Sequence, residues 1–235
     1  MRARYLLPFL MLLANWQGSA FAARPFMTDD ARLTTEGSCQ LESWTRRYTD
    51  RTEYWALPAC NPTGNLELTY GASVERDAGE NRVGASFAQA KTQLRPLKPN
   101  EWGLSVTAGR YLERAAAPGE RNVASNYLNV PFSVSLRDDD ILLHANAGLR
   151  RDMAQGRNFG NWGLSSEIRL RERLQLIVET YGEAHSSTLA QGGLRLWLIP
   201  DRLQVDATVG SDLRGTRESR WATLGLRVLT PAFLP

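Results

Sequence analysis

Histidine, a side chain suited to acid–base and metal chemistry, occurs only twice in this chain, as His144 and His185. His144 stands two residues before Asn146 in an alternating segment, so both side chains are expected on one polar face. Serine, histidine and asparagine form the catalytic set of outer-membrane lipid hydrolases. However, the His-any-Ser-Asn-Gly motif of outer-membrane phospholipases is absent, and no serine has a distinctive nucleophile spacing. We predict no enzyme and no catalytic residue; a lipid-modifying enzyme that uses His144 is the alternative.

Carboxylates and cysteines are the other residues of interest, because both can bind metal ions. Asp29-Asp30 and Asp138-Asp139-Asp140 lack the ligand spacing of an EF-hand loop. The two cysteines have no histidine nearby, which disfavours a zinc site. We predict no metal site and no cofactor.

Cys39 and Cys60 are instead predicted to form one disulfide, with two free thiols as the alternative. If residues 40–48 and 51–59 are strands joined by a turn at Thr49-Asp50, the two cysteines lie opposite each other. Opposed residues of antiparallel strands have Cα atoms about 4.5–5.5 Å apart, a distance that a disulfide spans.

A repeated strand pattern must position all of these residues. Residues 65–75 alternate between polar residues and an apolar set, as expected of a strand with two different faces. Similar segments, separated by turn signals, continue to the end of the chain. The sequence predicts an all-β fold, a single antiparallel transmembrane β-barrel of about 12 strands, or about 10 if the first hairpin is shorter or periplasmic. The apolar set in the first example is Leu66, Leu68, Tyr70, Ala72 and Val74.

Periodicity alone does not decide which face points outward. In a soluble periplasmic ligand-binding barrel, the second alternative, the apolar faces would point inward. The length of the segments, near ten residues where soluble strands average about five or six, favours the membrane. Aromatic residues near segment ends also favour it, because membrane barrels carry aromatic girdles there. These aromatic residues are Tyr54, Trp55, Trp102, Tyr127, Phe159, Trp162, Trp197 and Trp221.

In the membrane orientation, the charged residues of the polar faces line the lumen, and they carry both signs. They would either pair across a narrow lumen and hold its shape, or line a selective passage for a small solute. The predicted lumen-lining residues are Glu67, Glu75, His144, Arg150, Glu167, Arg169, Glu179, Arg195, Asp206 and Arg227.

The beginning of the chain has the pattern of an export signal. Arg2 and Arg4 precede an apolar stretch, and small residues up to Ala22 supply a cleavage site. The apolar run is shorter than the roughly 20 residues of a transmembrane helix. We predict a cleaved signal peptide at 1–22, a periplasmic N-terminal segment at 23–38 and a barrel at 39–235 in a Gram-negative outer membrane. The expected partners are outer-membrane lipids, periplasmic chaperones and the barrel-assembly machinery.

The composition is consistent with a membrane barrel and disfavours a nucleic-acid-binding protein. The net charge of +3 comes from dispersed residues, with no basic stripe of the kind that nucleic-acid-binding surfaces show. A mean hydropathy of −0.36 does not exclude a membrane barrel, because alternating strands average to low hydropathy. We predict no nucleic-acid partner.

Residues 24–31 (Arg-Pro-Phe-Met-Thr-Asp-Asp-Ala), with Gly37 and Gln40-Leu41-Glu42, resemble the opening of the Proteobacterial outer-membrane proteins of the MetA-pathway of phenol degradation family. Residues 192–201 are similar in style to a strand and turn found there. The resemblance implies an outer-membrane barrel that passes hydrophobic or aromatic compounds inward, and no catalytic residue carries over from it. The expected function is therefore a passive channel or transporter for a small hydrophobic or aromatic solute.

Overall fold

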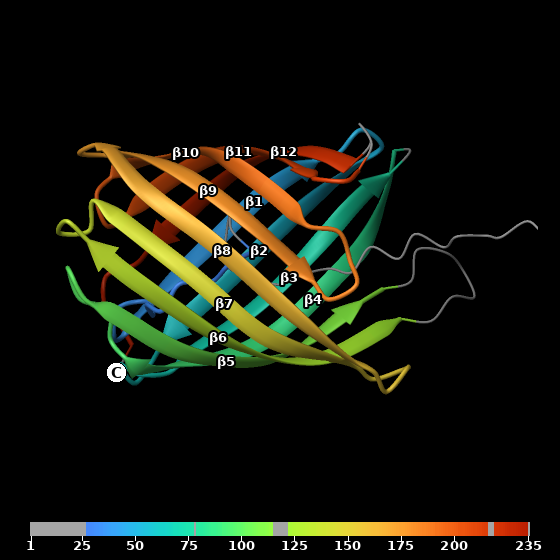
Figure 1. Ribbon diagram of the computed structural model, residues 1–235, viewed down its shortest axis with the longest axis horizontal. Helices are drawn as coiled ribbons and strands as arrows, with labels where there is room; N and C mark the ends of the chain where they lie inside the picture. The colour runs from blue at the N-terminus through green and yellow to red at the C-terminus, as the bar shows by residue number, and fades with distance from the viewer. Residues whose placement is uncertain (1–26, 78, 115–121, 216–218, 235) are drawn as a thin grey trace, which may run out of the picture.

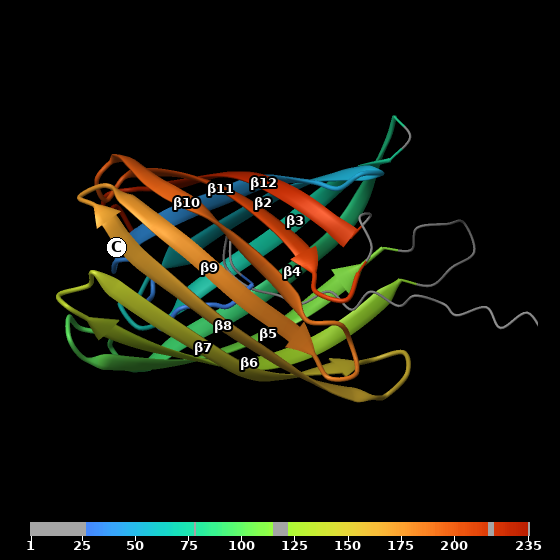
Figure 2. The same ribbon diagram turned by 45° about the horizontal axis from the view of Figure 1, so that its top comes forward.

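The chain folds into a closed barrel of antiparallel strands in a computed structural model that describes residues 27–77, 79–114, 122–215 and 219–234. Each strand pairs with its sequence neighbours, and β12 pairs with β1 to close the sheet (Figures 1 and 2). The predicted all-β barrel with twelve strands is confirmed. The strands are β1 (Ser38–Arg47), β2 (Arg51–Asn61), β3 (Glu67–Asp77), β4 (Glu80–Arg95), β5 (Trp102–Glu113), β6 (Val123–Leu136), β7 (Ile141–Asp152), β8 (Asn158–Arg171), β9 (Leu174–Glu183), β10 (Leu189–Ile199), β11 (Leu203–Asp212) and β12 (Arg220–Leu229).

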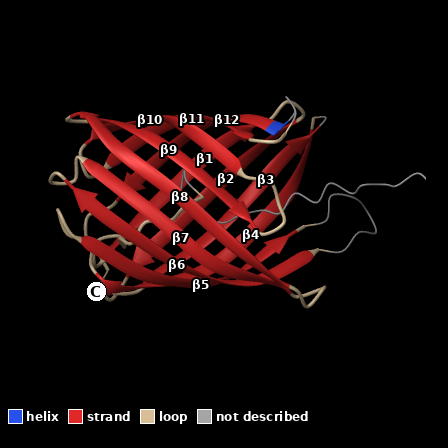
Figure 3. Ribbon diagram, viewed as in Figure 1, coloured by secondary structure: helices blue, strands red, loops and turns tan. Residues whose placement is uncertain are grey.

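The strands cross the barrel at a marked tilt and occupy nearly all of its wall (Figure 3). The predicted signal peptide at 1–22 lies outside the described residues. No helix among the described residues is long and apolar enough to cross a membrane.

The two faces of each strand differ as the alternation predicts. On β3, Leu68 and Tyr70 are 49% and 58% exposed, whereas their neighbours Glu67 and Thr69 are buried. The apolar face therefore points away from the barrel and the polar face points into it, which confirms the predicted orientation of this strand. This arrangement, with apolar residues outside and polar residues inside, is typical of membrane-spanning barrels.

The predicted disulfide is present at the start of the first hairpin. Cys39 lies directly opposite Cys60 in the β1–β2 register, and the two sulfur atoms are bonded. Local pairing of neighbouring strands was sufficient to predict this bond.

The predicted aromatic girdle is only partly present. Tyr54, Trp102 and Trp162 are exposed on the outside. The other five residues of the predicted girdle point inward instead: Trp55 stacks on Trp44, Phe159 lies opposite Arg150, Trp197 lines the internal cavity, and Tyr127 and Trp221 are buried.

Glycines on the inner wall explain how the lumen holds such large rings. Tyr127 lies directly opposite Gly109 across β5 and β6, and a Cβ atom on that glycine would be 2.5 Å from the tyrosine ring. Trp221 lies opposite Gly210 with a similarly close approach. Each ring therefore lies flat against the backbone of the neighbouring strand, in space that a side chain would otherwise fill.

The first strand begins and the last strand ends at the same end of the barrel, because the number of strands is even. Gly37, just before β1, accepts backbone hydrogen bonds from Phe233 and Leu234, which follow β12. We call this the terminal end, marked by C in Figure 1. We call the opposite end, where β5 and β11 end and β6 and β12 begin, the loop end.

Candidate functional site

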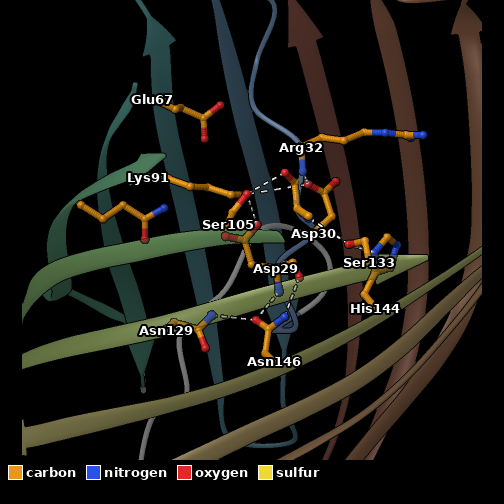
Figure 4. Close-up of polar contacts among 12 residues, drawn as sticks. Asp29, Asp30, Arg32, Glu67, Lys91, Ser105, Asn129, Ser133, His144 and Asn146 are labelled. Atoms are coloured by element: carbon orange, nitrogen blue, oxygen red, sulfur yellow. Dashed lines mark hydrogen bonds and ion pairs between the residues drawn. The ribbon is translucent and has the colours of Figure 1, made fainter. Parts of the chain in front are cut away.

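A segment without regular secondary structure, residues 28–34, lies inside the barrel; we call it the lumenal segment. Thr28, Ala31 and Thr34 are 2%, 0% and 4% exposed, although no strand of the wall contains them. The sequence predicted only that residues 23–38 form a periplasmic stretch before the first strand. Its position inside the lumen, shown in Figure 4, was not anticipated.

Side chains of the wall satisfy the backbone of the lumenal segment. The Asn146 amide binds Asp29 twice, accepting from its N–H at 2.9 Å and donating to its carbonyl at 2.7 Å. Ser133 Oγ accepts from the N–H of Ala31 at 2.9 Å, and Ser105 Oγ donates to the Ala31 carbonyl at 2.7 Å. Buried backbone groups need such partners, so β5, β6 and β7 together provide a polar binding site for an extended chain.

Charged groups bind the segment at both ends. Lys91 Nζ of β4 lies 2.8 Å from Asp29 Oδ1 and 3.7 Å from Asp30 Oδ1. Glu67 Oε2 of β3 accepts from the N–H of Thr34 at 2.7 Å and from its hydroxyl. At the first residue of the segment, the N–H of Thr28 donates to Glu179 of β9.

The pKa values of the two aspartates shift in opposite directions, although both carboxylates face Lys91. Burial raises the pKa of Asp29 to about 6, although Lys91 opposes this rise. Burial also acts against ionisation of Asp30, but Lys91, together with His144 and Arg32, lowers its pKa below the ordinary value. The segment therefore carries one carboxylate that titrates near neutrality and one that stays ionised.

The predicted lumenal residue His144 belongs to a chain of contacts that supports this site. Its Nδ1 lies 2.7 Å from Ser133 Oγ, and its Nε2 lies 3.7 Å from Glu167, which is paired with Arg195 at 2.7 Å. His144 is thus hydrogen-bonded to the neighbouring strand β6. The Ser133 hydroxyl is fully buried and already bonded to Ala31. Serine, histidine and carboxylate are therefore brought together around the lumenal segment, where they hold a backbone group in place.

The other predicted lumen-lining residues occupy different levels of the barrel. Glu75 pairs with Arg82, and Arg150 makes two hydrogen bonds of 2.7 Å to Glu183, both near the loop end. Near the terminal end, Arg227 lies 3.4 Å from Glu42 and Arg169 pairs with Asp140 at the rim. The remaining residue, Asp206, is buried opposite Arg195.

Sequence reasoning did not identify the wall residues that hold the segment, namely Lys91, Asn146, Ser133 and Ser105. One signal was available for Lys91, because the chain has only two lysines and the other, Lys98, is exposed in a turn. Asp29-Asp30 was considered as a metal ligand pair and as part of the resemblance at residues 24–31, and not as a group that binds the wall.

A cavity of about 340 Å³ lies next to the lumenal segment. The turn residues Asp139 and Asp201 line it, as do Lys91 and Phe87 deeper in the barrel. The cavity therefore extends from the terminal end to the lumenal segment.

Gly163 of β8 provides a direct test of where the segment lies. A Cβ atom at this position would be 2.3 Å from Thr28 Oγ1, whereas a Cβ atom on Gly160 would meet nothing within 4 Å. We expect Gly163→Ala to displace Thr28 and to increase acylation of Lys91, relative to Lys98, by roughly tenfold, a typical scale for overpacking. Peptide mass spectrometry measures both sites. Gly160→Ala is the matched control, and equal labelling in the two variants would contradict the placement of Thr28.

Comparison with known proteins places this barrel among porin folds. The KdgM porin in complex with disordered oligogalacturonate is similar with a TM-score of 0.60 at 9% identity, over 80% of this chain and 98% of that chain. The NanC porin is similar with a TM-score of 0.56 at 8% identity, over 82% and 98% of the two chains. Identities this low establish the shared fold alone. No curated protein shows significant similarity to the sequence.

A family model matches residues 10–230. It is not the MetA-pathway family that the N-terminal residues resemble; the barrel fold that this resemblance implied is present, but the family assignment is not supported. The chain belongs to the family described as Uncharacterised conserved protein UCP029691.

Proposed function

We propose that this protein is an outer-membrane channel for small neutral or cationic solutes, and that the lumenal segment closes it. The observation that carries the proposal is a polar, hydrogen-bonded chain segment lying across the lumen of a porin-like barrel. Its contacts are polar and several are charged, so water can replace them when the segment leaves. A permanent plug would be expected to bury apolar side chains instead.

The charge of the lumen supports the choice of solute. Among the described residues, the buried charged side chains comprise eight carboxylates and three cations. Acidic linings favour cations in channels, so an acidic saccharide such as the oligogalacturonate bound by the KdgM porin is a poor match for this lumen. The carboxylates are Asp29, Glu42, Glu53, Glu67, Asp152, Glu179, Glu183 and Asp206, and the cations are Arg46, Lys91 and Arg195.

Aromatic rings on the inner wall support a solute with an apolar or aromatic part. Trp44, Phe87, Tyr111 and Tyr127 pack as one buried cluster, with the Trp44 and Trp55 rings stacked at a centroid distance of 5.5 Å. Phe87 also lines the cavity. Rings at this position can stack against a planar solute.

The orientation follows from the connections. Membrane barrels have short turns on the periplasmic side and longer loops outside. The longest connection in this barrel, between β5 and β6, is at the loop end. We therefore place the loop end at the cell surface and the terminal end, with its cavity, in the periplasm, after export directed by residues 1–22.

Planar-bilayer recordings under a KCl gradient test this function. We expect conductance steps with a reversal potential that shows preference for K⁺ over Cl⁻, because carboxylates are in excess in the lumen. Preference for Cl⁻ would contradict the proposed solute class. Failure to conduct, even after the lumenal segment is removed, would contradict the channel itself.

Acidification should strengthen closure. The pKa of Asp29 is about 6 with the segment bound, against an ordinary value of 3.8, so the bound state takes up a proton as the pH falls through this window. Protonation of Asp29 therefore stabilises the closed state most at a pH below the ordinary pKa, and this stabilisation is lost as the pH rises past about 6. We expect the open probability to fall about tenfold between about pH 7.5 and about pH 5. Asp29→Asn should remove most of this dependence, and an unchanged dependence would exclude Asp29 as its source.

A further inference from the structure

The outer face of the barrel carries a band of arginines at the loop end. Each of these arginines lies at most three residues from the loop end of its strand, and its side chain is exposed. Among the outward-facing strand positions of the described residues, none holds a carboxylate. The five arginines are Arg47, Arg76, Arg110, Arg151 and Arg220.

Strand register gathers four of these arginines into two pairs. Arg110 and Arg151 lie on either side of Asn126, which is directly opposite both of them. Arg47 and Arg76 lie on either side of Thr52 in the same way. Adjacent strands are about 4.8 Å apart, so the two arginines of a pair stand about 10 Å apart with a hydrogen-bonding side chain between them.

The band differs from the opposite end of the barrel. At the terminal end, the outward-facing Arg95 is paired with Glu101 at 3.0 Å. Turns at both ends contain residues of both signs, such as Asp50 and Arg51 at the loop end, so the difference lies in the outward-facing strand positions. None of the five arginines at the loop end forms an ion pair with a described residue. Outward-facing arginines that have no ion pair with a described residue, just beyond an apolar belt, match a layer of anionic headgroups.

We propose that this arginine band binds phosphorylated headgroups of the glycolipid in the outer leaflet. Guanidinium groups form bidentate hydrogen bonds with phosphate, and arginines near an anionic membrane surface strengthen binding by roughly fivefold each. The Arg110–Asn126–Arg151 row provides two guanidinium groups and an amide for one headgroup. The Arg47–Thr52–Arg76 row provides a second site. This inference rests on the orientation of the barrel and is independent of whether the lumen conducts.

Titration of the detergent-solubilised mature protein with diphosphorylated lipid A, followed by native mass spectrometry, tests the proposal. We expect Arg110→Gln/Arg151→Gln to weaken binding about 25-fold, from roughly fivefold per arginine. Arg171→Gln, an exposed arginine at the terminal end, is the matched control and should bind as the wild type does. Heat-modifiable migration on gels shows that each variant is folded.

The wild-type protein alone supplies a second test, which does not depend on any variant folding. Lipid A from which the phosphates have been removed should bind at least about tenfold more weakly, because the arginines would lose their partners. Equal binding of the two lipids would overturn the proposal. It would also be overturned if inorganic phosphate at the same concentration displaced the lipid, since the arginines would then be a site for the free ion.

Discussion

Deleting residues 24–33 should convert a mostly closed barrel into one that conducts steadily. The deletion joins the expected cleavage region to Thr34 and removes the groups of the lumenal segment that bind Lys91, Asn146 and Ser133. The wall should survive, because its strands close through their own hydrogen bonds and through the Cys39–Cys60 disulfide. Single-channel recording of the deletion variant beside the wild type measures the change, and open probability should rise by at least about 100-fold if the several polar contacts are each of ordinary strength.

Two controls separate occlusion from a general loosening of the barrel. A variant in which glycine and serine replace residues 28–33 keeps the length of the segment but loses its side-chain contacts, and it should also open. Heat-modifiable migration should be unchanged in both variants. If the deletion variant stays closed, inward side chains such as Arg46 and Trp44 fill the lumen permanently, and the protein is not a channel.

The wall of this barrel could be predicted from the sequence because it depends on alternation within each strand and on pairing between strands that are neighbours in sequence. Alternation assigns a face to each residue, and the correct face for Trp197 and Trp221 follows from their neighbours Arg195 and Thr223. Nearness to a strand end was the weaker signal, and it led to the wrong prediction of a girdle at these positions. The disulfide is local in the same sense, because the two cysteines lie on adjacent strands of one hairpin.

The lumenal segment could not be predicted in this way. Residues 28–34 have no strand periodicity, and their partners are distant in sequence: Asn146 is 117 residues from Asp29, and Ser133 is 102 residues from Ala31. Those partners form one site only after twelve strands have closed. Each is an ordinary polar residue on an inward face, indistinguishable by pattern from neighbours that contact only the wall.

Replacing Lys91 with methionine should release the lumenal segment with a single change. Lys91 is 3% exposed and is the cation that faces both Asp29 and Asp30. Removing one partner of a buried ion pair costs about 3–5 kcal/mol, because the remaining charge loses its compensation. We therefore expect the open probability of Lys91→Met to rise by about 100-fold or more. Lys98→Met, at the exposed lysine, should leave the recordings unchanged.

A double-mutant cycle distinguishes loss of the ion pair from loss of packing. Adding Asp29→Leu to Lys91→Met removes the uncompensated carboxylate, and an apolar pair of similar volume is often as stable as the buried ion pair it replaces. We expect the double variant to close again, with a coupling free energy of about 3 kcal/mol between the two positions. The Asp29 backbone would still be bound by Asn146, because those hydrogen bonds do not involve its side chain. Additive effects of the two substitutions would mean that Lys91 acts on closure through some group other than Asp29, and Asp30, 3.7 Å away, would then be the position to substitute.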